Sequence, residues 1–238
     1  MEMQIYPSPN YYVGREGHSI VAIVDHIAQG YNLGEYFSNP NVRKSSNFSI
    51  SELGVITQHV AIGDTAWANG IDFTKGYIKY KSDLTIKWIA DCWQYNINPN
   101  LVTVSVEHEG LSGVPLSEEQ YQATLYLHTY LLGELNLEPS EVSIVGHFKL
   151  DAINRINCPG SGFPWERLRK DLNTMDVLAV QKLHSVMETA WNRQSDAHDL
   201  IIALAGDNSE GAKAIIESSR NWMIAFNMVK DNLGLSHI

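Results

Sequence analysis

The sequence is poor in cysteine, in positive charge and in long hydrophobic runs. Its 238 residues include two cysteines, Cys92 and Cys158, which form neither a close CxxC pair nor a disulfide framework. Lys and Arg number 17 against 27 Asp and Glu, and the net charge of -10 repels nucleic acid and anionic lipid. No apolar run approaches the roughly 20 residues of a membrane-spanning helix. A nucleic-acid-binding or membrane-inserted protein is therefore not expected.

The N-terminal segment, MEMQIYPSPN, also lacks the basic start and the apolar middle of a signal peptide. The hydrophobic fraction of 44% suits a packed globular protein, so a disordered chain is not expected. We therefore expect a folded protein that is made in the cytoplasm without an export signal.

Strand and helix patterns alternate over the first 173 residues. Short β-branched runs predict strands at 19–25, 45–50, 55–62, 101–107 and 142–146. Helical spacing predicts helices at 82–95 and 117–136, and Pro164 starts another. Ser117 followed by Gln120 is a capping box for the second of these helices. This interleaving predicts an α/β domain at 1–173 around one central sheet.

The pattern changes to helices alone after Asn173. Apolar residues at helical spacing predict helices near 176–191, 197–205 and 210–233, joined by short polar turns. We expect a second, all-α domain at 174–238, arranged as a three-helix bundle. So small a domain must pack tightly on itself, lean on the first domain or bury its apolar stripe in a partner.

Three potential metal ligands stand near the ends of predicted strands. His26 follows the strand at 19–25, His147 follows the strand at 142–146, and Cys158 lies in the loop NCPG. Two imidazoles and one thiolate suit zinc, and three protein ligands leave a fourth position for water, as in catalytic sites. Taken singly, a histidine or a lone cysteine is more often structural. A purely structural zinc site needs a fourth protein ligand, and no residue is spaced convincingly for that role.

Four sequence blocks add weight to this set of ligands. They are IVAIVDHIAQG, SSNFSISELGVITQHVAIGDTAWANG, VTVSVEHEG and IVGHFKLDAINRINCPG, which lie within residues 19–160. In that order they resemble blocks of the zinc-dependent N-acetylmuramoyl-L-alanine amidases. This family includes phage endolysins, cytosolic muropeptide amidases and animal peptidoglycan recognition proteins. The last block is the most specific, since a His followed at this distance by Cys-Pro-Gly is uncommon.

The resemblance implies a mixed central β-sheet flanked by helices, with a zinc-bearing groove at one edge. It implies that His26, His147 and Cys158 hold Zn2+ and that Glu107 is the base that activates water. Glu109, two residues further on, shares the strand face of Glu107 and remains an alternative base. The residues expected to line the groove and contact substrate are Trp67, Asn69 and Phe48.

Two positions depart from the family pattern. The substrate loop often reads AWHAG in the family, and here Asn69 stands where the histidine would be. Many members carry a lysine two residues before the third ligand, where it stabilises the developing oxyanion, and this chain has Ile156 there. Arg155 and Lys149, from the same loop, are the candidates to replace that lysine.

The activity implied by the resemblance is hydrolysis of the amide bond between N-acetylmuramic acid and L-alanine in bacterial peptidoglycan or muropeptides. The C-terminal helices would target the cell wall or form a homodimer. A phage-type endolysin, synthesised in the host cytoplasm and acting on the wall after release, suits this organisation.

Two other functions stay open. A peptidoglycan-binding module that has lost hydrolysis is favoured by Ile156, although the retained Cys158 argues against it. A glycosidase would use Glu107 and a second carboxylate, but it leaves two histidines and a cysteine unexplained.

Overall fold

A six-stranded mixed sheet forms the centre of the structure, a computed structural model that describes residues 3–79 and 81–174. Neighbouring strands run parallel except β4 and β5, which are antiparallel. The predicted α/β fold with a mixed central sheet is therefore confirmed. The strand order is β1 (Met3–Ile5), β5 (Ile56–Gln58), β4 (Phe48–Ile50), β7 (Thr103–His108), β3 (Ala22–Ile27) and β8 (Ile144–Gly146). A separate antiparallel pair consists of β2 (Tyr11–Tyr12) and β6 (Thr65–Ala66).

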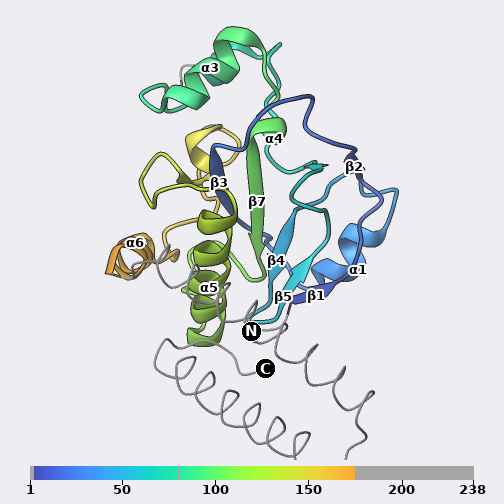
Figure 1. Cartoon of the computed structure of the whole chain (residues 1–238), viewed down its shortest axis with the longest axis vertical. Coiled ribbons are helices and arrows are strands. Elements are labelled where there is room, and N and C mark those ends of the chain that lie inside the picture. Colours follow the sequence, from blue (N-terminus) through green and yellow to red (C-terminus); the bar gives the residue numbers. More distant parts are fainter. Residues whose placement is uncertain (1–2, 80, 175–238) are drawn as a thin grey trace, which may run out of the picture. The chain divides into compact units, whose positions relative to one another are not determined.

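Helices cover both faces of this sheet (Figure 1). On one face, α5 (Glu118–Glu134) and α6 (Trp165–Thr174) pack against the alternate residues of β3 and β7 that include Ile23. On the other face, α3 (Lys87–Tyr95) packs near Val24 of β3. The short helices are α1 (Leu33–Ser38), α2 (Gly76–Lys79), α4 (Pro99–Val102) and the 3-10 helix η1 (His147–Lys149).

The two central strands, β3 and β7, explain how the sheet presents polar side chains. Their side chains are buried on both faces, as is usual for parallel strands covered by helices. In β7, Val104 and Val106 join the core beneath α5, whereas Thr103, Ser105 and Glu107 belong to the opposite face. The two faces of β7 therefore alternate between apolar and polar residues, and Glu107 is the residue of β7 that is not fully buried.

Several elements begin or end later than predicted, among them β3 and α3. The strand expected at 19–25 continues to Ile27, because β7 pairs with it up to that residue, so His26 lies inside the strand and not after it. The helix expected at 82–95 begins at Lys87. The carboxylate of Asp83 accepts hydrogen bonds from the backbone and hydroxyl of Thr85, and these bonds hold a turn before the helix.

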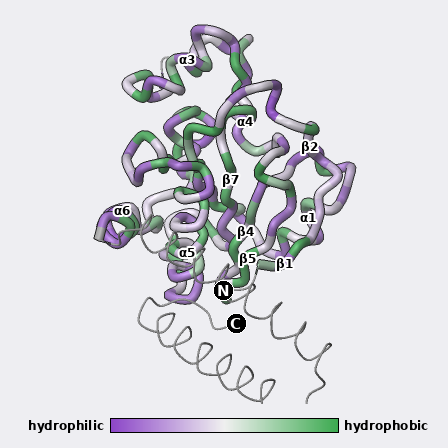
Figure 2. Tube along the Cα trace, in the orientation of Figure 1, coloured by the Kyte–Doolittle hydropathy of each residue, from purple (hydrophilic) through white to green (hydrophobic). Residues whose placement is uncertain are grey.

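The start of α5 is fixed by its cap. The Ser117 hydroxyl oxygen accepts a hydrogen bond from the backbone N–H of Gln120, as predicted. The Gln120 side chain ties the helix to the sheet, because its Nε2 donates to the carbonyl oxygens of Ile50 and Glu109. Figure 2 shows the contrast between the hydrophobic central strands and the hydrophilic α6.

The predicted all-α domain at 174–238 lies outside the described residues, apart from Thr174 at the end of α6. Its three helices and its role in targeting or pairing therefore stay predictions. Among the helices that the structure describes, none combines the length and apolarity needed to cross a membrane.

Candidate active site

Three parallel strands bring their carboxyl ends, and three functional side chains, to one edge of the sheet. His26 of β3 and Glu107 of β7 are register partners, and His147 follows β8 directly. The His26 and His147 rings meet edge to face with centroids 4.4 Å apart. Ligand sites of α/β proteins commonly form at this edge, outside the carboxyl ends of parallel strands.

The loop after η1 returns Cys158 to the same edge. The backbone N–H of Phe148 donates to the Cys158 carbonyl oxygen at 3.0 Å, and the Cys158 N–H donates to the Arg155 carbonyl oxygen at 2.9 Å. Gly160 has a φ of +94°, and a Cβ there would overlap the Ser112 hydroxyl. The tight NCPG turn therefore needs its glycine, and it holds the Cys158 sulfur 3.7 Å from His26 Nδ1.

The donor atoms of His26, His147 and Cys158 fit a metal ion. All three lie within 4.8 Å of one another, and they are the one group of this kind found among the described residues. Burial lowers the pKa of His26 well below its usual value and that of His147 to about 3, so both imidazoles are neutral and keep a lone pair. Two neutral imidazoles with one sulfur form a donor set that zinc prefers, and the absence of a fourth ligand among the described residues matches a catalytic site.

The protonation state of the Cys158 thiol depends on the groups around it. Burial, reinforced by the nearby carboxylate of Glu107, raises the pKa of this thiol to about 12. The pocket therefore disfavours a thiolate unless a cation is bound beside it. As a metal ligand, Cys158 would lose this proton when the metal binds.

Glu107 lies beside these donors with one oxygen that makes no hydrogen bond. Its Oε1 is 3.8 Å from His26 Nδ1, and its Oε2 is buried without a hydrogen-bond partner in the described structure. Burial raises the pKa of Glu107 to about 7, although Lys44 and Arg155 oppose this shift. A carboxylate with a pKa near neutrality suits proton transfer. Glu109, by contrast, accepts a hydrogen bond from the backbone N–H of Leu33 at 2.9 Å.

A cavity of about 770 Å³ opens over the metal-ligand group. It brings together Glu107, the three ligands and two further residues expected from the sequence, Trp67 and Arg155. The half-buried Trp67 ring lies 5.0 Å from the Tyr12 ring, and its Nε1 has no hydrogen-bond partner among the described residues. The cavity wall therefore includes an aromatic side chain.

Phe48 does not line this cavity, so its expected contact with substrate is wrong. It is 1% exposed and lies in the hydrophobic core beneath α5. The reason is its register, because Phe48 of β4 pairs with Val106 and takes the face of Val106. The opposite face, on which Glu107 lies, carries Ser49.

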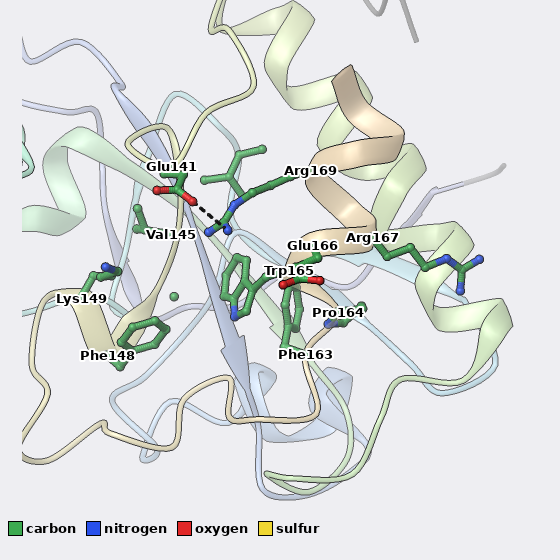
Figure 3. A pocket seen from close by; sticks show the side chains of 12 residues that line it. Glu141, Val145, Phe148, Lys149, Phe163, Pro164, Trp165, Glu166, Arg167 and Arg169 are labelled. Atoms are coloured by element: carbon green, nitrogen blue, oxygen red, sulfur yellow. Dashed lines mark ion pairs between the residues drawn. The ribbon is translucent and has the colours of Figure 1, made fainter. Parts of the chain in front are cut away.

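Asn69 and Lys149 also do not line this cavity, contrary to the prediction from the sequence. Asn69 is buried, and its Oδ1 lies 2.6 Å from Nε2 of His26. It is not among the residues that line the cavity. Lys149 forms an ion pair of 2.7 Å with Asp83. It lines a different cavity, of about 710 Å³, together with Phe148 and residues near the start of α6 (Figure 3).

Sequence reasoning missed several residues of the cavity wall, among them Lys44, Tyr31 and Tyr36. These three lie in loops and in the short α1, where no periodic pattern marks a face. Lys44 directly precedes the block SSNFSISELG, and this closeness was the available signal. Its position gives the cavity a second cation beside Arg155 in a chain whose net charge is -10.

Comparison with known proteins agrees with this geometry. A family model described as N-acetylmuramoyl-L-alanine amidase matches residues 16–161. A solved structure of AmpD, as a selenomethionine derivative, is 20% identical, covers 71% of this chain and 93% of its own, and superposes with a TM-score of 0.54. The Staphylococcus aureus hydrolase AmiA in complex with its ligand is 11% identical, with 76% and 85% covered and a TM-score of 0.50.

At these identities the solved structures show a shared fold alone. A comparison with curated proteins finds no match. The family model, however, spans more than half of the 238 residues and includes His26, Glu107, His147 and Cys158. The chain therefore belongs to the N-acetylmuramoyl-L-alanine amidase family.

Proposed function

We propose that this chain is a zinc-dependent enzyme that hydrolyses the amide bond between N-acetylmuramic acid and the L-alanine of the peptidoglycan stem peptide. The observation that carries the proposal is the meeting of His26, His147, Cys158 and Glu107 in one cavity. The family match supports the same reaction, and zinc dependence is typical of that family.

The metal would be held by His26, His147 and Cys158. When bound, zinc supplies an electrophile that polarises the scissile carbonyl and lowers the pKa of water. The backbones that carry these three donors are held by β3, β8 and the hydrogen bonds of the NCPG turn.

Glu107 would move the proton that amide hydrolysis requires. The oxygen of water attacks the carbonyl carbon, and a Glu107 oxygen takes the proton that this water releases. The same carboxyl then gives a proton to the L-alanine nitrogen as the C–N bond breaks, so the products are a muramic acid carboxylate and a peptide with a free amino group. Its pKa near neutrality allows Glu107 both to accept and to return the proton.

Two cationic side chains would stabilise negative charge, one on the reacting carbonyl oxygen and one on the substrate. The family's lysine is replaced by Ile156, and Lys149 is held by Asp83 outside the cavity. Arg155 and Lys44 line the cavity and interact electrostatically with Glu107. We assign Arg155 to the carbonyl oxygen as it becomes negative and Lys44 to a carboxylate of the stem peptide.

Trp67 would bind the substrate rather than react with it. Its ring offers an aromatic face to sugar or peptide.

The proposed biological role rests on the domain organisation that is common in this family. We propose a phage-type endolysin that is synthesised in the host cytoplasm and acts on the cell wall after release, with residues 174–238 targeting the wall or forming a homodimer. A preference for intact walls over soluble muropeptides supports this role, and the reverse preference argues for recycling of wall fragments.

The proposed reaction is tested by mass spectrometry of muropeptides after digestion. Release of free stem peptides with an L-alanine amino terminus supports it, and loss of that release in Glu107→Gln assigns the proton transfer. A binding module without hydrolysis, the second candidate because of Ile156, instead retains muropeptides without cutting them.

A further inference from the structure

Asn69 makes the closest side-chain contact with a proposed metal ligand. Its Oδ1 lies 2.6 Å from Nε2 of His26, and both residues are buried, with exposures of 1% and 2%. Nδ1 is the His26 nitrogen that faces Cys158 and Glu107. One ring nitrogen therefore meets Asn69 and the other meets the metal-ligand group.

The orientation of the Asn69 amide is fixed by a chain of hydrogen bonds. The Pro99 carbonyl oxygen can only accept, so the Thr103 hydroxyl donates its single proton to it at 2.7 Å. The Thr103 oxygen then accepts from Asn69 Nδ2 at 2.8 Å. With Nδ2 committed to Thr103, the atom that faces His26 is Oδ1.

This orientation selects one form of the His26 ring. Oδ1 can only accept a hydrogen bond, so His26 Nε2 must carry the proton and donate it. In the other neutral form two lone pairs would face each other across 2.6 Å. Turning the amide over would relieve that clash at His26, but it would oppose Oδ1 to a Thr103 oxygen that has no proton left to give.

The backbone around Asn69 holds the amide in place. The N–H groups of Ala68 and Asn69 both donate to Asn100 Oδ1, at 3.1 and 2.5 Å. The N–H of Trp67 donates to the Ser45 hydroxyl oxygen at 2.8 Å. Three successive backbone groups are thus tied to buried side chains, and the loop gives Asn69 little freedom to retreat from His26.

We propose that Asn69 is a positioning residue that keeps His26 in its Nε2–H form and so directs the Nδ1 lone pair at the metal position. The partner of a ligating histidine orients the ring and increases its basicity, and removal of such a partner typically weakens metal binding about 10–100-fold. The role deepens the proposed zinc enzyme, and therefore rests on it, but the state of the ring can be measured without metal or substrate.

The direct test is the protonation pattern of His26 in the full-length, metal-free chain. Long-range 1H–15N correlation spectra of 15N-histidine-labelled protein distinguish the two neutral forms, and His26→Gln assigns the signal. We expect a proton on Nε2 of His26. A proton on Nδ1 overturns the proposal, whatever the protein's zinc content or activity.

Variants test whether Asn69 causes this preference. Asn69→Leu removes the acceptor and should weaken zinc affinity about 10–100-fold, measured by competition with a chelating dye. Asn69→Asp keeps an acceptor and should restore most of the affinity. Unchanged zinc affinity together with an unchanged ring form in Asn69→Leu overturns the proposal.

A matched control separates positioning from general loss of packing. Asn47 is also buried and bonds to the sheet, through Ser105, but it touches no proposed ligand. Asn47→Leu should lower thermal stability while leaving zinc affinity within about threefold of the wild-type value, and an equal loss of affinity in both variants overturns a specific role for Asn69. If Asn69→Leu does not fold, the wild-type ring form and Asn69→Asp decide the matter.

These outcomes also separate this proposal from the proposed function. An Nε2–H ring in a protein that binds no zinc refutes the zinc enzyme and leaves the effect of Asn69 on the ring form intact, but not its role towards a metal. Tight zinc binding with an Nδ1–H ring in the metal-free chain refutes the positioning and leaves the zinc enzyme intact.

Discussion

Replacing Glu107 by glutamine is expected to change activity and stability in opposite directions. An amide is nearly isosteric with the carboxylate but cannot take the proton of the attacking water. Loss of a general base typically costs about 10²–10⁴ in rate, so kcat for amide hydrolysis should fall by that factor. Zinc content should stay at the wild-type level, because Glu107 is not one of the three proposed ligands.

The predicted change in stability follows from the pKa of Glu107 in the metal-free protein. Burial raises it from 4.5 to about 7, and the side chain is 17% exposed. Below the lower value the carboxyl is protonated in both folded and unfolded chains and has no effect. As pH rises through this window the unfolded chain ionises first, so the wild type loses up to about 3 kcal/mol of stability.

Glu107→Gln carries no such charge, so its stability relative to the wild type should rise by about 3 kcal/mol between about pH 4 and pH 8. Urea unfolding with chelator present, at both pH values, measures this change. Glu109→Gln is the control, because its Oε1 can still accept from the Leu33 N–H, and it should keep the wild-type rate. A fully active Glu107→Gln, or a pH-independent stability difference, would refute the reasoning.

Three further substitutions probe the rest of the site. Cys158→Ser should lose zinc and activity together, as measured by metal analysis and stem-peptide release; full zinc and full rate would remove Cys158 from the ligand set. Arg155→Met should lower kcat about 10²-fold if the guanidinium faces the reacting carbonyl, and an unchanged kcat would contradict that role. Lys149→Met should stay within about threefold of wild-type kcat, because Asp83 holds this lysine outside the cavity.

Local patterns predicted much of the fold because they report on each segment separately. The period-2 alternation of Val104 and Val106 marked the core face of β7 and put Glu107 on the polar one, although the burial of both faces could not be predicted from it. The Ser117 cap marked the start of α5 to the residue. His147 and Cys158 could be paired because a strand exit and a Cys-Pro-Gly turn are both readable locally.

Residues misread from the sequence depend on partners that lie far away in the chain. Phe48 lies in the core because β4 pairs in register with β7, and a shift by one residue would have turned it to the face of Glu107 instead. Lys149 is occupied by Asp83, 66 residues earlier. Asn69 faces His26 from 43 residues away. No periodicity within a segment carries such information.

The central claim is tested most directly by one experiment on purified full-length protein, in which zinc content and digestion products are measured before chelation, after chelation and after zinc is returned. We expect about one zinc per chain, and free stem peptides beginning with L-alanine that disappear with the metal and return with it. Undiminished release of these peptides from zinc-free protein, or cleavage between sugars instead of at the amide, would contradict the account.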